Sequence, residues 1–350
     1  MKNVIVGQSG GPTAAINASL AGVFETARAL GLGTVYGMRH GIEGLLKGQV
    51  IDLSAQLHDS MDVELLKRTP SSFLGSCRFK LPAPGTDDAV YTALFHKLEA
   101  LEIGYFIYIG GNDSMDTVSK LADFFSEDPE APMLIGLPKT IDNDLAGTDH
   151  TPGYGSAAKY LAVTMDELIQ DTAIYAVPSV TIVEVMGRHA GWLTLAAALP
   201  KMLGGMKPDI IALPEVTFDE DIFIKNVEKK LKTTQNIVVA VSEGIRDERG
   251  QYIGSDAKSG AVDIFGHAYL SGVGKYLERL VGIRIGCKVR SIELNLMQRC
   301  AAHLGSLADI EESFQIGEQG VNAAVNGETG KMLAVRRLSD HPYQMECDVI

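Results

Sequence analysis

Short apolar runs that alternate with longer helical patterns constrain the fold of this chain most strongly. Within each run the apolar residues are continuous, which indicates strands covered on both faces, as in a parallel sheet. Helical patterns such as Asp113–Phe125 and Gly155–Ala173 separate them, so a doubly wound α/β fold is predicted. The runs are NVIVG (Asn3–Gly7), YFIYIGG (Tyr105–Gly111), PMLIGL (Pro132–Leu137), SVTIVEV (Ser179–Val185), DIIALPE (Asp209–Glu215) and NIVVAVSEG (Asn236–Gly244).

Length and charge exclude several classes of protein. A chain of 350 residues is long enough for two domains of ordinary size. The net charge of −13 argues against nucleic acid as a partner, because phosphate backbones attract surplus Lys and Arg. No apolar stretch approaches the ~20 residues of a membrane span. The start, MKNVIVGQSGG, reads as a strand and turn and not as a signal peptide.

The cysteines and histidines show no metal-ligand spacing. Without a CxxC pair, the four scattered cysteines predict reduced thiols in a cytoplasmic protein. They are Cys77, Cys287, Cys300 and Cys347. The histidines expected to be structural or peripheral are His189, His267 and His303.

Glycines and polar residues follow five of the apolar runs. In an open α/β sheet, ligands bind at the edge formed by the carboxyl ends of the strands. Convergence of five such ends therefore indicates a binding edge. The segments are Gln8–Pro12, Gly110–Ser114, Pro138–Asp144, Met186–His189 and Glu243–Gly244.

Two of these segments carry a glycine pair ahead of a helix. Gly10-Gly11 fits either an anion-binding turn with N–H groups facing a phosphate or a tight turn that needs a positive φ. After the second pair, Asp113 and Ser114 fit helix N-caps or a second phosphate-facing turn, and capping is favoured for this segment alone. Neither segment matches the dinucleotide or P-loop fingerprint.

The segment PKTIDND (Pro138–Asp144) carries the strongest chemical signal. Phosphoryl transfer needs a carboxylate to accept the proton of the attacking hydroxyl and oxygen ligands for Mg²⁺. It also needs a cation to offset charge on the transferring group. Asp142, Asp144 and Lys139 supply all three within one short loop.

Four arginines stand near the other motifs. Arginine suits a bidentate grip on a phosphomonoester, although an exposed surface position is the default interpretation of each one alone. Arg78 lies in FLGSCRF and Arg188 begins RHAGW. Arg290 and Arg299 flank Ser291–Met297, which is predicted to be a strand.

Together, these motifs resemble the phosphofructokinase family over most of the chain. In order, they are SGGPTAAINA, FLGSCRF, GGNDS, PKTIDND, TDHTPGYGSAAKY, VEVMGRHAGWL, SEG and VRSIELNLMQRCAAH. The resemblance implies two Rossmann-like α/β domains facing each other across an active-site cleft, and a homodimer or homotetramer. The expected domains are 1–153 for the phosphoryl donor, 154–300 for the sugar phosphate, and 301–350 for helices crossing back to the first domain and a tail. That tail, from about Lys331, reads as irregular and peripheral.

The resemblance also implies roles for single residues. Asp142 is implied to be the general base that activates the 1-hydroxyl of fructose 6-phosphate, with Lys139 and Asp113 completing the catalytic group. Asn112 and Asp144 are implied to hold Mg²⁺. The implied donor-binding residues are Gly11, Arg78 and Ser114. The implied sugar-phosphate-binding residues are Thr140, Ile141, Asp142, Met186, Gly187, Arg188, Glu243, Arg290 and Arg299.

Two of these positions distinguish the branches of the family. ATP-dependent members typically carry glycine where Asp113 and Lys139 stand here. A carboxylate at Asp113 would crowd and repel the α-phosphate of ATP, whereas Lys139 offers a cation to a pyrophosphate leaving group. The pair is therefore similar to the pyrophosphate-dependent branch.

Three positions depart from the family pattern. Asn112 stands where the family usually has a metal-binding aspartate. Ser179 stands where many relatives have an arginine that reaches the 6-phosphate from a neighbouring subunit. Leu296 replaces a histidine that contacts substrate in ATP-dependent members. The last two leave room for another sugar phosphate, such as sedoheptulose 7-phosphate.

The expected activity is reversible, Mg²⁺-dependent transfer of a phosphoryl group from pyrophosphate to fructose 6-phosphate, giving fructose 1,6-bisphosphate and phosphate. One alternative is an ATP-dependent 6-phosphofructokinase that tolerates Asp113 and Lys139. A second alternative, from another class, is a non-catalytic sugar-phosphate sensor. The presence of Asp142 argues against the sensor, because a binding module needs no general base.

Overall fold

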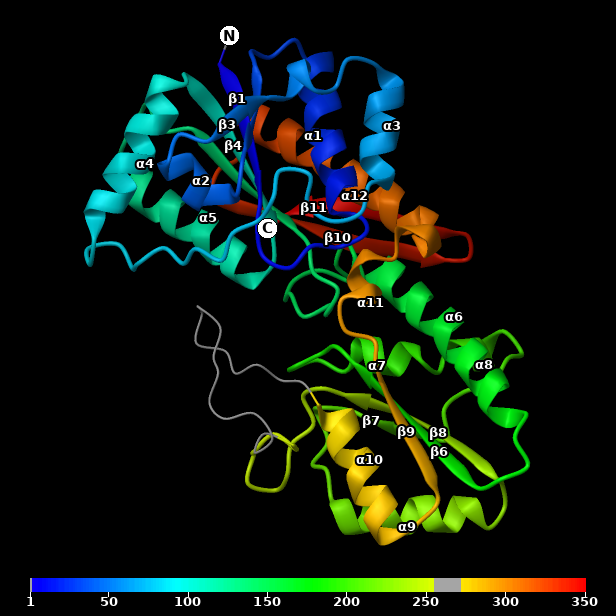
Figure 1. The fold of residues 1–350 in the computed structure, drawn as a ribbon. Coiled ribbons are helices and arrows are strands. Elements are labelled where there is room, and N and C mark those ends of the chain that lie inside the picture. The colour runs from blue at the N-terminus through cyan, green and yellow to red at the C-terminus, as the bar shows by residue number, and fades with distance from the viewer. Residues whose placement is uncertain (1, 255–271) are drawn as a thin grey trace. The chain divides into compact units, whose positions relative to one another are not determined.

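The chain folds into two compact α/β units (Figure 1). The computed structural model describes residues 2–254 and 272–350, so His267 lies outside the described residues. The first unit comprises the residues up to Ile141, then Leu145–Ser156 and Arg299–Ile350. The second comprises Asp142–Asp144 and Ala157–Gln298. The predicted α/β class with Rossmann-like sheets is confirmed.

The first unit is built on a seven-stranded, mostly parallel sheet of order β11-β10-β5-β4-β1-β2-β3. Its strands are β1 (Asn3–Gln8), β2 (Val35–Met38), β3 (Val50–Asp52), β4 (Ile103–Gly110), β5 (Met133–Pro138), β10 (Lys331–Asp340) and β11 (Tyr343–Val349). Only the two edge strands, β3 and β11, pair antiparallel with their neighbours in this sheet.

Helices cover both faces of this sheet. They are α1 (Ile16–Ala29), α2 (Gly41–Leu46), α3 (Ser60–Arg68), α4 (Asp88–Ala100), α5 (Asn112–Phe125) and α12 (Leu307–Val325). Along β1, Val4 and Val6 join the core with α1 and α12, whereas Ile5 joins the core with α2, α4 and α5. All three side chains are fully buried, and each contributes roughly 1.5–3 kcal/mol to folding. The continuous apolar runs of the sequence therefore reflect a sheet that is buried on both sides.

Helices α1 and α12 approach each other closely because each presents a glycine to the other. A Cβ added to Gly22 would lie 2.1 Å from the backbone oxygen of Phe314. One added to Gly317 would lie 2.2 Å from the backbone oxygen of Ser19. This pair holds the returning C-terminal part of the chain against the start of the first unit.

The second unit has a four-stranded parallel sheet of order β7-β8-β6-β9. Its elements are α6 (Tyr154–Ala173), which begins in the first unit, β6 (Ser179–Val185), α7 (Trp192–Ala196), α8 (Leu199–Met202), β7 (Ile210–Ala212), α9 (Glu220–Leu231), β8 (Asn236–Ser242), α10 (Val273–Arg284), β9 (Lys288–Glu293) and α11 (Met297–Cys300), which ends in the first unit. Val180 and Ile182 pack with α9 and α10 on one face. Thr181, between them, lies 3.4 Å from the hydroxyl of Thr172 on α6, which places α6 on the other face.

Two sequence-based expectations about local structure are wrong. The tail from Lys331 is not irregular: β10 pairs with β5 and forms a hairpin with β11. The strand expected at Ser291–Met297 begins earlier, at Lys288, and ends at Glu293. Asn295 has a left-handed φ of 44°, and the chain turns there so that the short helix α11 begins at Met297. No helix in the described part of the chain is long and apolar enough to cross a membrane.

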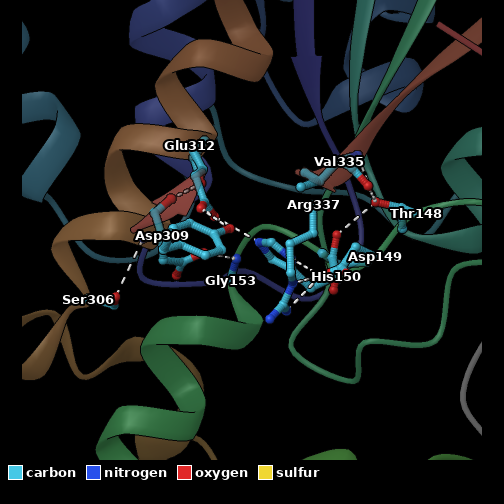
Figure 2. Close-up of polar contacts among 12 residues, drawn as sticks. Thr148, Asp149, His150, Gly153, Ser306, Asp309, Glu312, Val335 and Arg337 are labelled. Atoms are coloured by element: carbon cyan, nitrogen blue, oxygen red, sulfur yellow. Dashed lines mark hydrogen bonds and ion pairs between the residues drawn. The ribbon is translucent and has the colours of Figure 1, made fainter. Parts of the chain in front are cut away.

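A polar network joins α12 and the C-terminal hairpin to the loop before α6 (Figure 2). His150 Nδ1 lies 2.9 Å from Asp149 Oδ1, and Nε2 lies 2.8 Å from Glu312 Oε2. Arg337 donates to the same Asp149 oxygen, and Tyr343 donates to the other oxygen of Glu312. Both ring nitrogens can donate only in the imidazolium form. Burial lowers the pKa of His150, but the hydrogen bonds to Glu312 and Asp149 outweigh it and raise the pKa above its ordinary value.

We predict that His150→Gln removes a pH-dependent part of the stability. A raised folded-state pKa stabilises the protein fully below the unfolded value of about 6.5, and this contribution is lost as pH rises through the folded-state pKa. Urea unfolding midpoints should therefore differ most between wild type and variant at acidic pH and converge at alkaline pH. His96→Gln, at an exposed position on α4, is the matched control. A pH-independent difference for His150→Gln would contradict the imidazolium assignment.

Candidate active site

Three of the five predicted strand ends meet at one edge of the first unit's sheet. The ladder pairs Gln8 of β1 with Ile109 of β4, and Gly110 of β4 with Pro138 of β5. Because these strands are parallel neighbours, the segments that follow them emerge side by side. The other two ends belong to the second unit, where Val185 of β6 pairs with Ser242 of β8.

The turn after β1 binds the ammonium group of Lys139. Lys139 is 2% exposed, and its Nζ donates to the backbone oxygens of Ser9 (3.0 Å) and Gly11 (2.5 Å). Gly10 has φ 75°, so this turn does require a positive φ. A buried cation therefore lies directly against the Gly10-Gly11 turn, where it makes the local potential favourable for an anion.

The turn after β4 starts α5 in a way that the sequence did not indicate. The N-cap is Gly111, without a side-chain cap, and Asp113 and Ser114 lie within the first turn, so the favoured capping interpretation is wrong. Ser114 is buried and its hydroxyl hydrogen-bonds the hydroxyl of Ser9, whereas Asn112 and Asp113 are exposed. The two glycine turns are thus joined through a pair of serine hydroxyls, of which Ser9 was not predicted.

The loop that carries Arg78 is fastened to the first glycine turn by hydrogen bonds. Ser76 Oγ donates to the backbone oxygen of Gly10 (2.6 Å), and the Gly10 N–H donates to the backbone oxygen of Cys77 (3.2 Å). Gln8 adds a further bond by accepting from the Leu74 N–H (2.9 Å). The sequence analysis placed Gln8 in the polar segment after the first apolar run but assigned no contact to its side chain.

The loop after β5 is tied to the chain just before α6. The Thr140 N–H donates to the backbone oxygen of Pro152 (3.1 Å), and Thr151 Oγ1 donates to the Thr140 oxygen (2.8 Å). Ile141 is buried, and Asn143, between the two aspartates, takes a left-handed φ of 55°. Asparagine tolerates that conformation, which explains why it separates Asp142 and Asp144.

The two arginines predicted to grip a 6-phosphate belong to different units. Arg299 lies in the first unit, and its Nη1 is 3.2 Å from the position of a Cβ added to Gly11. Arg290 lies in the second unit on β9, opposite Thr181 of β6. At the start of β6, two residues before Thr181, the hydroxyl of Ser179 donates to Asn236 Oδ1 (2.7 Å).

The second unit brings Met186, Gly187, Arg188 and Glu243 together. The Glu243 N–H donates to the Val185 oxygen, and Glu243 Oε1 accepts from the Gly187 N–H (3.4 Å). Gly187 has φ 135°, and an added Cβ would lie 2.5 Å from the backbone oxygen of Ala190. This segment can therefore turn sharply only with a glycine at that position.

Gln298 and the guanidinium of Arg188 add two polar features to this edge. Gln298, which the sequence did not single out, accepts from the Met186 N–H (3.2 Å). Arg188 Nε is buried without a hydrogen-bond partner among the described residues. A buried donor without a partner is costly, and sites that bind an oxygen-rich ligand commonly contain one.

Glu243 is an ionisable group with a strongly perturbed pKa. Burial raises its pKa to about 7, and the negative charges of Asp142 and Glu184 add to this rise. The Gly187 N–H and the positive charge of Arg188 act in the opposite direction. Asp142 and Glu243 thus interact electrostatically in the second unit, and perturbed carboxylates of this kind are typical of functional sites.

The metal prediction can be tested against the chemistry of the donor groups. No cluster of three or more His, Cys, Asp or Glu side chains suited to a metal lies within the described residues. Mg²⁺ commonly binds through one or two carboxylates with substrate phosphates and water completing its shell. Asp144 of the second unit offers a carboxylate and Asn112 of the first unit an amide oxygen, and each is a ligand type that Mg²⁺ accepts.

Comparison with known proteins decides the family. The family model for phosphofructokinase matches residues 3–293. The chain belongs to the phosphofructokinase family. A pyrophosphate–fructose 6-phosphate 1-phosphotransferase from Methylococcus capsulatus is 40% identical over 349 residues, which cover 99% of this chain and 82% of that protein. One from Xanthomonas campestris is 42% identical over 344 residues, covering 98% of this chain and 81% of that protein.

A solved phosphofructokinase structure shows the same fold. The crystal structure of a pyrophosphate-dependent phosphofructokinase from Nitrosospira multiformis has a TM-score of 0.86 and 34% identity. The match covers 99% of this chain and 82% of that one. The resemblance that the motifs carried is therefore confirmed for the phosphofructokinase family and its fold.

We predict that Glu243→Gln stabilises the protein increasingly as pH rises from about 5 to about 8. A raised folded-state pKa means that wild type loses stability as Glu243 ionises between its unfolded value and about 7. Glutamine keeps the shape of the side chain and cannot ionise. The free energy of unfolding of the variant should therefore exceed that of wild type by on the order of 2 kcal/mol at the alkaline end of this range. Urea unfolding measures it, with exposed Glu248→Gln as the control. Equal pH dependence in wild type and Glu243→Gln would show that Glu243 ionises like a surface carboxylate.

Proposed function

We propose that this protein transfers a phosphoryl group reversibly from pyrophosphate to the 1-hydroxyl of fructose 6-phosphate, giving fructose 1,6-bisphosphate and phosphate. The donor choice rests on Lys139, whose buried ammonium binds the backbone of the Gly10-Gly11 turn. Pyrophosphate has no adenosine, so its binding energy must come from charge contacts of this kind. The two pyrophosphate-dependent relatives support the same donor.

Asp142 is the proposed general base. It accepts the proton of the 1-hydroxyl as that oxygen attacks the transferring phosphorus in line with the leaving phosphate. Its negative charge contributes to the raised pKa of nearby Glu243. The raised pKa of Glu243 leaves this carboxyl able to hold a proton for a sugar hydroxyl near neutral pH.

The remaining residues divide between the two ligands. In the first unit, the proposed donor site consists of Gly11, Arg78, Asp113, Ser114 and Lys139. The proposed sugar-phosphate contacts are Thr140, Ile141, Met186, Gly187, Arg188, Glu243, Arg290 and Arg299. Arg188 Nε, buried without a partner among the described residues, supports this assignment because a ligand oxygen would satisfy it.

We propose Mg²⁺ as the cofactor, held by Asp144 and Asn112 together with the phosphates. When bound, the ion supplies positive charge that offsets the negative charge of the phosphates. Among the described residues, the thiols of Cys77, Cys287 and Cys347 are not in disulfide bonds, which supports the proposed cytoplasmic location. A homodimer or homotetramer remains a proposal from the family resemblance, to be tested by the solution mass.

We predict that the choice of phosphoryl donor depends on Asp113 and Lys139. Purified wild type should turn over fructose 6-phosphate with pyrophosphate and not with ATP. The double variant Asp113→Gly, Lys139→Gly should lose most activity with pyrophosphate and gain activity with ATP, because the charge repulsion and the crowding are removed. Coupled assays with both donors measure this. Asp116→Gly, which places a glycine in the same exposed stretch of α5, controls for weakening of the helix. A double variant that gains no activity with ATP would contradict the steric argument.

A separate prediction tests Asp142 as the general base. Asp142→Asn should lower kcat by well over ~10²-fold, the scale of a lost acid–base group, because the amide cannot accept the hydroxyl proton. The KM for fructose 6-phosphate should change much less. Steady-state kinetics measure both, with exposed Asp171→Asn of α6 as the matched control. Near-normal turnover by Asp142→Asn would show that another group is the base.

A further inference from the structure

Asp309, at the start of α12, is a buried carboxylate outside the proposed site. It is 3% exposed and accepts three hydrogen bonds from the beginning of α6. Its Oδ1 accepts from the Gly153 N–H (2.8 Å), and its Oδ2 accepts from the Ser156 N–H (3.0 Å) and from the Ser156 hydroxyl. Figure 2 shows Asp309 beside Gly153, the residue that immediately precedes α6.

Among the described residues, these donors are the groups that stabilise a charge on Asp309. Burial raises the pKa of Asp309, whereas the hydrogen bonds from Ser156 and Gly153 lower it. The first N–H groups of a helix have no partner within the helix, and they carry the positive end of its dipole. Asp309 therefore caps α6 from a different element, and it fixes where the residues before α6 lie.

Those residues hold Thr140. Pro152 accepts from the Thr140 N–H (3.1 Å), and Thr151 donates its hydroxyl to the Thr140 oxygen (2.8 Å). Gly153 packs closely against Thr13: its φ is 103° and an added Cβ would lie 2.6 Å from Thr13 Cγ2, so only glycine fits at this position. Asp309, Gly153 and Thr140 thus form one hydrogen-bonded chain within the first unit.

Thr140 is the second residue before Asp142, and its two backbone groups are held by that chain. Lys139, the residue before Thr140, is held by other contacts. The Lys139 N–H donates to the Gly110 oxygen (2.8 Å) as part of the sheet, and its Nζ is bound by the glycine turn. Loss of Asp309 should therefore disturb the segment leading to Asp142 and leave Lys139 in place.

We propose that Asp309 is a positioning residue for Asp142, acting through Gly153 and Thr140. The inference rests on the proposed function, since it assigns to Asp142 the role of base. A displacement of about 1 Å in a reacting group can cost ~10²-fold in rate. Loss of the hydrogen bonds that hold Thr140, two residues before Asp142, should therefore lower the turnover rate.

The test is the kinetics of Asp309→Asn, which keeps the size of the side chain. An amide presents a donor where a carboxylate oxygen accepted two hydrogen bonds, so the anchor should fail. We expect kcat to fall at least ~10-fold while the KM for pyrophosphate stays within ~2-fold, because the donor turn is held independently. Val321→Ala, a cavity variant of α12, is the control for stability alone: it should lower the unfolding temperature and leave kcat unchanged.

A double-mutant cycle separates positioning from simple destabilisation. Thr151→Val removes the hydroxyl that binds the Thr140 oxygen, and Thr151→Ser should restore it. If Asp309 acts through this segment, the effects of Asp309→Asn and Thr151→Val on kcat should be clearly less than additive. Should Asp309→Asn not fold, Thr151→Val alone must lower kcat and Thr151→Ser must rescue it.

Two outcomes would overturn the inference. One is an Asp309→Asn protein that behaves like Val321→Ala, with reduced stability and unchanged kcat. The other is additive effects in the cycle. Failure of the proposed function is distinguishable, because it shows in wild type as a lack of turnover with pyrophosphate. In that case the same variants are compared with whichever donor wild type accepts.

Discussion

The parallel pairing of β1, β4 and β5 is the constraint on which the first unit's site depends. Parallel strands end at the same edge, so Gln8, Gly110 and Pro138 deliver their following segments side by side. Lys139 then needs only one further residue of chain to reach the carbonyl oxygens of the glycine turn. The side-chain contacts of the site follow from a backbone register that buried Val and Ile residues fix.

The sequence was sufficient to predict the central strands and the polar segments at their ends. Continuous apolar runs identify doubly covered strands, and glycine with acidic residues marks the turns after them. The sequence was insufficient wherever a long-range partner decides the structure. β10 becomes a strand because β5 offers it an edge, and the N-cap of α5 falls on Gly111 because β4 runs to Gly110. The contacts of Ser9, Gln298 and Asp309 also depend on residues distant in sequence, so no local pattern signals them.

Several charged groups in and next to the proposed site cost stability. Lys139, Asp309 and Glu184 are nearly excluded from water, and Glu243 is buried enough for its pKa to rise to about 7. Each of the three fully charged groups has backbone partners: carbonyl oxygens for Lys139, N–H groups at the start of α6 for Asp309, and the N–H groups of Gly272 and Gly274 for Glu184. Backbone partners are held by secondary structure, so they stay in place whichever substrate is bound.

This use of backbone partners bears on why a lysine serves a small inorganic donor. An ammonium held by two carbonyl oxygens has lost most of its side-chain freedom before any ligand arrives, so little entropy remains to be lost on binding. A donor with an adenosine group gains affinity from many apolar contacts and tolerates a loosely placed cation. Pyrophosphate offers only charge, and its recognition depends on where the charges of the protein are fixed. A lysine fixed by the glycine turn, with an acidic residue in the first turn of α5 to disfavour a larger donor, suits pyrophosphate better than ATP.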